Sequence, residues 1–310
     1  MHNNPIHLPP PLRRGDCIGL FSPSGPVREQ EKLEAGIRIL HDLGFKTYLS
    51  PAKETGHPYL ADDDDHRVQE FHSMWRDSKI KAMMAVRGGY GCMRLMPHLD
   101  HNLIQQSPKM VIGFSDLTVM LNTLAVQLST MAVHGPVLTS LSSLDAESLD
   151  SFVSLVSGNF YENKSFRGLE IVRGGRGTGV LRGGNLTTIS HLLGTPWEVP
   201  FAGTLLFIED TGEPMYKIDR MLTQLSISGH LEQLSGLLVG CFDCGADTNT
   251  NIRLQEDIWN RVLELTGNAS FPVWGNVPVG HLSANHSLPI GMIAIQDSSF
   301  GTLMIDRNSH

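Results

Sequence analysis

The first 130 residues alternate between short apolar runs and stretches with helical periodicity, and this alternation limits the folds open to the chain. Four runs have the length and composition of strands: Cys17–Ser22, Lys46–Leu49, Ala82–Val86 and Met110–Phe114. Three intervening stretches place apolar residues at helical spacing: Glu29–Leu43, His66–Ser78 and Leu117–Leu128. Such alternation favours a parallel sheet with helices on both faces. We therefore predict an α/β fold for this half.

Beyond residue 158 the composition changes. Glycine and arginine concentrate in Arg173–Gly177 and Arg182–Gly184, which predicts a connection into a second domain. Apolar runs and two helical stretches follow: Thr204–Ile208, Tyr216–Leu225, Leu237–Val239, Leu254–Leu265, Val273–Val279 and Met292–Ile295. A length of 310 residues fits two domains, at roughly 100–200 residues each. We predict an N-terminal α/β domain over 1–160, a linker over 161–180 and a strand-rich α+β C-terminal domain over 181–310.

Composition excludes several classes of protein. The chain has 24 Lys+Arg against 32 Asp+Glu, a formal net charge of −8 that disfavours binding to nucleic acid or to an anionic membrane surface. Four cysteines in 310 residues do not form a disulfide scaffold. The apolar runs are too short to span a bilayer or to form the core of a secretory signal. The sequence therefore predicts a cytoplasmic protein with neither a nucleic acid nor a membrane as partner.

The stretch Lys109–Thr118 is the strongest indication of chemistry. An apolar strand runs into a small-residue turn holding Ser115, and a periodic helix follows at once. A strand–elbow–helix turn lifts a serine hydroxyl clear of the sheet and leaves backbone N–H groups free at the helix start. These donors suit a developing oxyanion. The alternative is that Ser115 only caps the helix, which is a common role for serine.

A nucleophilic serine needs a base, and the base needs an orienting acceptor. Glu209 closes the run Thr204–Ile208, and His281 follows the run that ends at Gly280. Residues at strand ends gather at one sheet edge, where such folds place their sites. Each residue also has a plain alternative, since Glu209 could be a surface acid and His281 a loop histidine. Glu213 and His286 lie close enough in sequence to compete for the same roles.

Three further motifs carry weaker signals. The loop Arg87–Gly91 follows a strand and could bring backbone close to a substrate, but it matches neither a dinucleotide nor a phosphate loop. The pair Cys241 and Cys244 has no second pair or suitably spaced histidine, so we interpret both as structural. The acids Asp62–Asp65 precede a predicted helix and fit its solvated start. We expect neither a metal nor a cofactor.

At these positions the chain resembles the LD-carboxypeptidase family of serine peptidases, which comprises muramoyltetrapeptide carboxypeptidases and related microcin-immunity proteins. The matching segments occur in order along nearly the whole chain: Gly15–Ile18 with Ser22–Gly25, Ala85–Gly91, Gly113–Asp116, His134–Pro136, Gly183–Leu186 with Gly194–Pro196, Glu209–Asp210 with Ile218–Leu222, and Gly280–His281 with Leu288–Gly291.

The resemblance implies a catalytic triad of Ser115, His281 and Glu209, and it selects Glu209 over Glu213 and His281 over His286. It also implies an oxyanion hole formed by the backbone N–H groups of Gly89 and Asp116. The implied fold is a flavodoxin-like N-terminal domain joined to a strand-rich C-terminal domain, often in a homodimer. The implied reaction releases D-alanine from a murein tetrapeptide that ends in meso-diaminopimelate–D-alanine, in the cytoplasm during cell-wall recycling.

Two other functions compete with this one. A microcin-immunity-type hydrolase would use the same triad on a peptidyl or aminoacyl nucleotide, and only its pocket would differ. A noncatalytic module that binds a small ligand on a two-domain α/β scaffold would need no triad.

Overall fold

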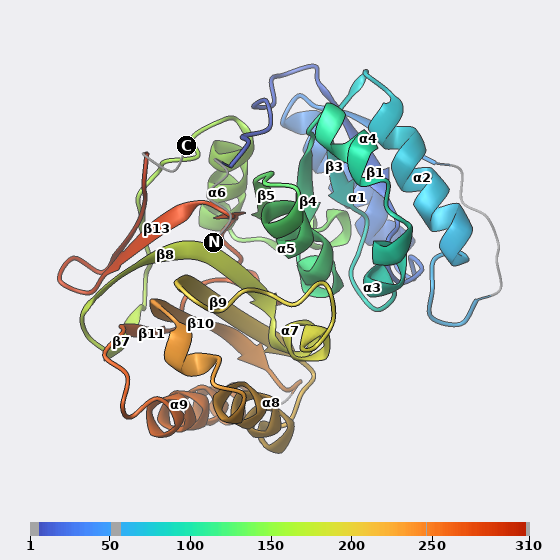
Figure 1. Cartoon of the computed structure of the whole chain (residues 1–310). Helices are drawn as coiled ribbons and strands as arrows, with labels where there is room; N and C mark the ends of the chain where they lie inside the picture. The colour runs from blue at the N-terminus through green and yellow to red at the C-terminus, as the bar shows by residue number, and fades with distance from the viewer. Residues whose placement is uncertain (1–5, 51–56, 246, 308–310) are drawn as a thin grey trace. The chain divides into compact units, whose positions relative to one another are not determined.

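The computed structural model describes residues 6–50, 57–245 and 247–307, and its backbone forms two compact units (Figure 1). Unit 1 comprises residues 1–159 together with 286–289, and unit 2 comprises 160–285 with 290–310. Each unit has its own sheet, as expected for an α/β chain with a parallel-sheet N-terminal region and a strand-rich C-terminal region. That expected fold class is confirmed.

Unit 1 is built on a six-stranded sheet, counted over the described residues, with the order β12-β5-β4-β3-β1-β2. Its strands are β1 (Cys17–Phe21), β2 (Lys46–Leu49), β3 (Ile80–Ala85), β4 (Met110–Gly113), β5 (Ala132–His134) and β12 (Leu288–Ile290). Strands β1 to β5 pair in parallel. All four residues of β4 are buried, so this strand forms part of the core that carries the elbow after it.

The helices of unit 1 lie between its strands in the chain, and three of them, over 30–42, 64–76 and 118–127, correspond to the stretches that the periodicity predicts. They are α1 (Gln30–Asp42), α2 (Asp64–Arg76), α3 (Cys92–Leu95), α4 (His101–Gln106), α5 (Thr118–Gln127) and α6 (Ala146–Val156), with 3₁₀ turns η1 (Met96–His98), η2 (Ser115–Leu117) and η3 (Leu138–Ser143). Helix α2 packs against β1 and β3, and α5 packs against β4 and β5. Their apolar faces thereby bury the sheet.

Unit 2 contains an eight-stranded sheet, again among the described residues, with the order β6-β14-β13-β8-β9-β10-β11-β7. Its strands are β6 (Lys164–Ser165), β7 (Glu170–Arg173), β8 (Arg176–Asn185), β9 (Thr204–Thr211), β10 (Gly236–Asp243), β11 (Val273–Gly275), β13 (Ile293–Asp297) and β14 (Thr302–Ile305). Strands β8 to β11 are parallel, and the outer strands pair antiparallel.

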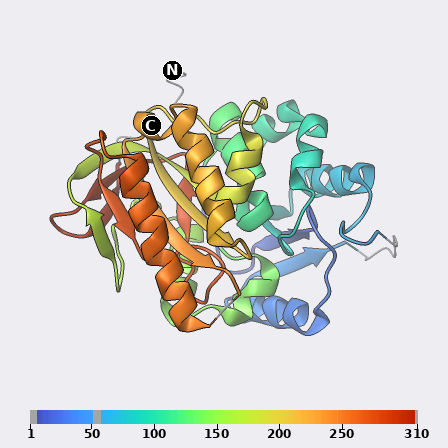
Figure 2. The same cartoon turned by 90° about the horizontal axis from the view of Figure 1, so that it is seen from below.

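Helices α8 (Met215–Ile227) and α9 (Thr248–Leu265) run side by side over this sheet (Figure 2). Leu222 of α8 and Ile258 of α9 are fully buried in a core shared with Leu206 and Val239 of the sheet. Helix α7 (Leu186–Leu192) and the turn η4 (Leu231–Gln233) complete the unit. The parallel centre of the sheet thus sets the ends of β8, β9 and β10 at one edge.

Two segments differ from the sequence-based expectation. Helix α9 begins at Thr248, six residues before the predicted start, because the Asp247 side chain caps it by accepting hydrogen bonds from the N–H groups of Asn249 and Thr250. The stretch 161–180, predicted as a linker, forms β6, β7 and the first half of β8, all of them paired within the sheet. Gly168, Gly174 and Gly175 lie in the turns between these strands, whereas Gly177 and Gly179 lie within β8.

In the part of the chain that the structure describes, no helix combines the length and the apolar character needed to cross a membrane.

Candidate active site

Ser115 stands on a strained turn between β4 and α5. Its φ angle is +64°, in the left-handed region that serine rarely adopts. The residues that cap η2 and α5 are Phe114 and Leu117, and neither cap uses a side-chain hydrogen bond. Ser115 is therefore not a helix cap of the ordinary kind, and its backbone has the strained elbow conformation expected of an exposed nucleophile.

The loop Arg87–Gly91 lies directly against this serine. A Cβ atom placed on Gly88 would lie 2.9 Å from both Cβ and Oγ of Ser115, so only glycine permits this close approach. Gly89 has a φ of +123°, and no hydrogen bond among the described residues uses its backbone N–H. The Gly89 N–H is thus available near the serine.

Asp116 supplies the second predicted donor. Its backbone N–H falls in the first turn of η2, where N–H groups have no partner within the helix. Its side chain is 9% exposed, and its Oδ2 accepts hydrogen bonds from Ser24 Oγ at 2.6 Å and from the Cys92 N–H at 2.8 Å. Burial raises the pKa of this carboxyl, while the bonds from Ser24 and Cys92 and the charge of Arg67 oppose that rise.

Glu209 and His281 meet in unit 2. Glu209 lies near the end of β9 with no exposed surface, and its Oε2 is 2.6 Å from His281 Nδ1. Gly280 permits the contact, because a Cβ on it would lie 3.0 Å from Glu209 Cβ and Oε2. The competing acid Glu213 instead forms an ion pair of 3.0 Å with Lys217.

The electrostatics of this pair suit a catalytic base. Burial is the largest single influence on His281 and lowers its pKa, yet the charge of Glu209 and the hydrogen bond to it more than offset burial. Asp210 and Asp243 act in the same direction, so the pKa of His281 is raised. A carboxylate on Nδ1 fixes the tautomer and leaves Nε2 to exchange a proton.

The comparisons with known proteins cover both units of the chain. Residues 18–135 match the LD-carboxypeptidase N-terminal domain, and residues 178–295 match the LD-carboxypeptidase C-terminal domain. The chain belongs to the LD-carboxypeptidase family. It is therefore an enzyme, a peptidase of the kind that this family comprises. The resemblance drawn from the sequence motifs is confirmed.

Several relatives carry more specific names. A probable murein peptide carboxypeptidase of Bacillus subtilis is 32% identical, over 97% of this chain and 94% of the relative. A murein tetrapeptide carboxypeptidase of Pseudomonas aeruginosa is 31% identical, over 91% and 93%. The microcin C7 self-immunity protein MccF of Escherichia coli is 27% identical, over 90% and 89%. The crystal structure of an MccF-like protein from Bacillus anthracis superposes with a TM-score of 0.86 at 25% identity, covering 96% of this chain and 99% of that one.

Within this LD-carboxypeptidase fold, sequence reasoning missed the structural role of Asp210. It is 3% exposed and accepts hydrogen bonds of 2.8 Å from Asn185 Nδ2 and from both the N–H and Oγ1 of Thr187. These bonds tie the end of β9, beside Glu209, to the start of α7. The sequence feature that could have indicated this role is the pair of acids Glu209 and Asp210 at the end of a strand. Of the two, only Glu209 is assigned a function from the sequence.

The cysteine pair fits its structural interpretation. All four cysteines are free thiols, and burial raises the pKa of Cys241 to about 12, which keeps its thiol protonated at neutral pH. Cys244 Sγ lies 3.1 Å from the side-chain oxygen of Asn251. Both residues therefore serve as packing and hydrogen-bonding groups at the end of β10.

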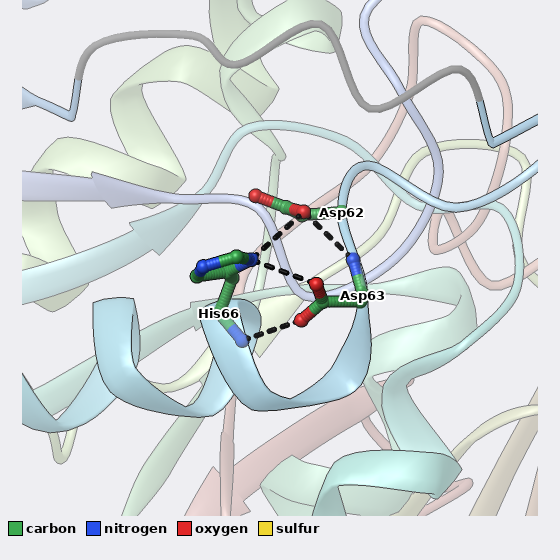
Figure 3. A group of neighbouring side chains, drawn as sticks. All are labelled: Asp62, Asp63 and His66. Atoms are coloured by element: carbon green, nitrogen blue, oxygen red, sulfur yellow. Dashed lines mark hydrogen bonds and ion pairs between the residues drawn. The ribbon is translucent and has the colours of Figure 1, made fainter.

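Among the described residues, one group of side chains has metal-ligand spacing: Asp62, Asp63 and His66 (Figure 3). Its atoms already bond to one another, since His66 Nδ1 is 2.8 Å from Asp63 Oδ2 and 3.3 Å from Asp62 Oδ1. Asp63 also caps α2 by accepting from the His66 N–H at 2.8 Å. The group therefore forms the acidic start of α2, as the sequence predicts.

Proposed function

We propose that this LD-carboxypeptidase cleaves the bond that releases terminal D-alanine from a murein tetrapeptide, using Ser115 as nucleophile, His281 as base and Glu209 as orienting acid. The observation that carries the proposal is the 2.6 Å contact between His281 Nδ1 and the fully buried Glu209 Oε2. This pair differs from an ion pair at the surface, because burying a carboxylate is costly unless a partner group binds it.

The mechanism follows from these roles. As Ser115 Oγ attacks the carbonyl carbon, Nε2 of His281 takes the hydroxyl proton, and the imidazolium is stabilised by Glu209. When the tetrahedral intermediate collapses, His281 returns the proton to the nitrogen of the departing D-alanine. A water molecule, deprotonated by the same imidazole, then attacks the acyl-enzyme and frees Ser115.

The N–H groups of Gly89 and Asp116 would hold the oxyanion of the tetrahedral intermediate. Both belong to unit 1, and the strained backbone of Ser115 presents its hydroxyl beside the loop that carries Gly89. Each donor would contribute about 2.7–4 kcal/mol to the transition state, as measured for one oxyanion donor in another serine peptidase. Ser115 belongs to unit 1, whereas Glu209 and His281 belong to unit 2.

The names of the relatives support a murein peptide as substrate, since they include murein peptide and murein tetrapeptide carboxypeptidases at 31–32% identity. The family resemblance supports, as parts of the same proposal, a role in murein recycling, a location in the cytoplasm and a homodimeric enzyme. These three features, together with the serine mechanism, form part of the proposal.

A second function is a microcin-immunity-type hydrolase that cleaves a peptidyl or aminoacyl nucleotide with the same triad. The fold similarity to an MccF-like protein, with a TM-score of 0.86, favours it. Sequence identity favours the carboxypeptidase, at 31–32% against 27% for MccF itself.

Mass spectrometry of the purified protein, incubated separately with a murein tetrapeptide and a peptidyl-adenylate analogue, decides between the two. We expect loss of one alanine from the tetrapeptide, and no loss with Ser115→Ala. Cleavage of the adenylate alone would establish the immunity-type function instead. If neither substrate is cleaved and an active-serine probe leaves Ser115 unmodified, the proposal fails in favour of a noncatalytic binding module.

A further inference from the structure

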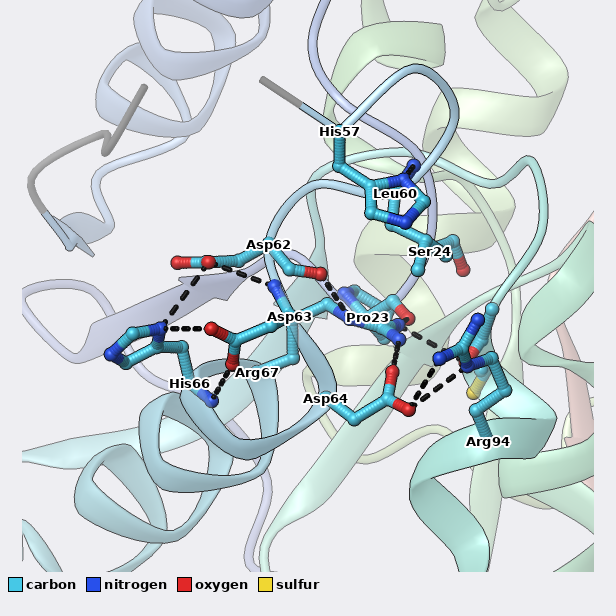
Figure 4. Close-up of polar contacts among 12 residues, drawn as sticks. Pro23, Ser24, His57, Leu60, Asp62, Asp63, Asp64, His66, Arg67 and Arg94 are labelled. Carbon is cyan, nitrogen blue, oxygen red and sulfur yellow. Dashed lines mark hydrogen bonds and ion pairs between the residues drawn. The ribbon is translucent and has the colours of Figure 1, made fainter. Parts of the chain in front are cut away.

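Two buried charged residues outside the proposed triad bind the same two backbone segments of unit 1. Arg67, on α2, is 2% exposed, and Asp116, in η2, is 9% exposed. Figure 4 shows Arg67 beneath the turn at Pro23 and Ser24, with Asp64 and Arg94 beside it. Buried charges of this kind are costly unless they are fully paired, so their partners show what they hold in place.

Arg67 donates to three backbone carbonyls, and its Nη2 also pairs with the Asp64 carboxylate at 2.5 Å. Its Nη1 donates to the carbonyls of Pro23 and of Gly91, the latter at 3.0 Å, and its Nε donates to the Asp62 carbonyl at 3.1 Å. A Cβ on Gly91 would lie 2.9 Å from Nη1, so the absence of a side chain there allows the guanidinium to reach the loop. Arg67 thereby links α2 to both segments.

Asp116 binds the next residue along each of these segments. Its Oδ2 accepts from the hydroxyl of Ser24, which follows Pro23, and from the N–H of Cys92, which follows Gly91. The same two segments, 23–24 and 91–92, are therefore each bound by two side chains of opposite charge. The basic side chain comes from α2 and the acidic one from the elbow. The loop and the turn also bond directly, since the Gly25 N–H donates to the Gly88 carbonyl at 3.2 Å.

We propose that the side chains of Arg67 and Asp116 act as positioning residues that fix the distance between the two oxyanion donors, the N–H groups of Gly89 and Asp116. We call this pair the loop clamp. The inference rests on the proposed function, because it assigns these donors to the oxyanion hole. The acid and its own backbone donor belong to one residue, so the side-chain bonds to Ser24 and Cys92 also hold the residue that carries the donor.

The charges of the loop clamp explain why ionisable residues occupy these positions. Asp116 Oδ2 accepts two hydrogen bonds, and these bonds together with the Arg67 charge oppose the rise that burial causes in the pKa of this carboxyl. Charge-assisted bonds are shorter and stronger than neutral ones. Oxyanion stabilisation depends on donors fixed before the reaction, and a displacement of about 1 Å can cost 100-fold in rate.

The test compares Arg67→Met and Asp116→Asn with the wild-type full-length protein. On a murein tetrapeptide we expect kcat to fall about 10- to 100-fold with KM changed less than about threefold, because the clamp acts on the transition state. The rate at which a fluorophosphonate modifies Ser115 should fall by a similar factor. Arg67→Lys, which keeps the charge, should recover part of both rates.

Arg76→Met is the matched control. Arg76 lies in the last turn of the same helix, α2, and its side chain is exposed to solvent. It should retain wild-type rates. Circular dichroism and the midpoint of urea unfolding identify variants that fail to fold, and for these the charge-retaining Arg67→Lys provides the comparison.

The two parts of the experiment separate the clamp from the substrate assignment. A wild type that reacts with the fluorophosphonate yet leaves the tetrapeptide intact contradicts the proposed substrate, and the modification rates still test the clamp. Folded Arg67→Met and Asp116→Asn with wild-type modification rates would overturn the clamp whatever the substrate is. A wild-type Ser115 that does not react at all would overturn the triad and the clamp together.

Discussion

Nδ1 of His281 lies 2.6 Å from Oε2 of Glu209, and the Glu209 side chain has no contact with solvent. Away from water, the attraction between a carboxylate and an imidazolium is screened far less than at the surface. The pair therefore does two things at once: it holds the ring in the tautomer that offers Nε2 as a base, and it stabilises the charge that the ring acquires during the reaction. Two consequences can be measured.

Replacing Glu209 by glutamine should remove most of the activity. The amide nearly matches the carboxylate in shape, but it lacks the negative charge and can donate to Nδ1, which favours the wrong tautomer. The corresponding change in another serine peptidase lowers kcat about 10⁴-fold, and we expect a loss of about 10³- to 10⁴-fold here. Turnover of the tetrapeptide measures it. Glu213→Gln serves as the control and should stay within about twofold, since Glu213 pairs with Lys217.

The pH profile should report the raised pKa of His281. Only the neutral imidazole acts as a base, so kcat/KM should fall as the pH drops through the pKa of the free enzyme. Since Glu209 raises that pKa, we expect the acid limb to lie above the ordinary histidine value of about 6.5. The residual activity of Glu209→Gln should show its acid limb at a lower pH than the wild type. Without the Glu209 charge, burial has the larger effect on the pKa of His281 and lowers it. An acid limb that stays in place in the variant would contradict this account.

The sequence predicts the parallel part of unit 1 well because the physical cause is local. Strand β4 is buried at every position, and a buried parallel strand appears as a short continuous apolar run. Strand β12 could not be predicted in this way. It joins the sheet of unit 1 from residues 288–290, and nothing in a three-residue segment specifies a partner more than 150 residues away.

The residues of the candidate site likewise differ in whether a local sequence pattern predicts them. Ser115 could be recognised from its neighbours, because an elbow is a local change from strand to helix. The loop clamp could not, since Arg67 lies on a helix that appears amphipathic and charged, and its role depends on carbonyls at positions 23 and 91. Asp116 was selected for its backbone, and the contacts of its side chain with Ser24 and Cys92 depend on the folded loops.

Gly88→Ala should impair catalysis through crowding at the nucleophile. The added Cβ would lie 2.9 Å from Cβ and Oγ of Ser115, which is closer than such atoms can approach, so the loop or the serine must move. Overpacking of this kind costs about 1–3 kcal/mol of stability, and a displaced nucleophile should lower kcat at least about 10-fold. Steady-state kinetics and urea unfolding measure both effects. Gly267→Ala, where the closest neighbour would be 3.7 Å away, should change neither.

Leu222→Ala should destabilise unit 2 without touching the site. Leu222 is fully buried on α8 within the core between this helix and the sheet, and removing a buried leucine side chain typically costs about 2–5 kcal/mol. Ile227, at the end of the same helix, is 82% exposed, so Ile227→Ala should cost less than about 0.5 kcal/mol. The free energy of unfolding in urea, followed by circular dichroism, measures the difference. Equal losses in the two variants would show that the helix is not held by the core described here, whereas a large loss confined to Leu222→Ala locates the stability of the unit in that packing.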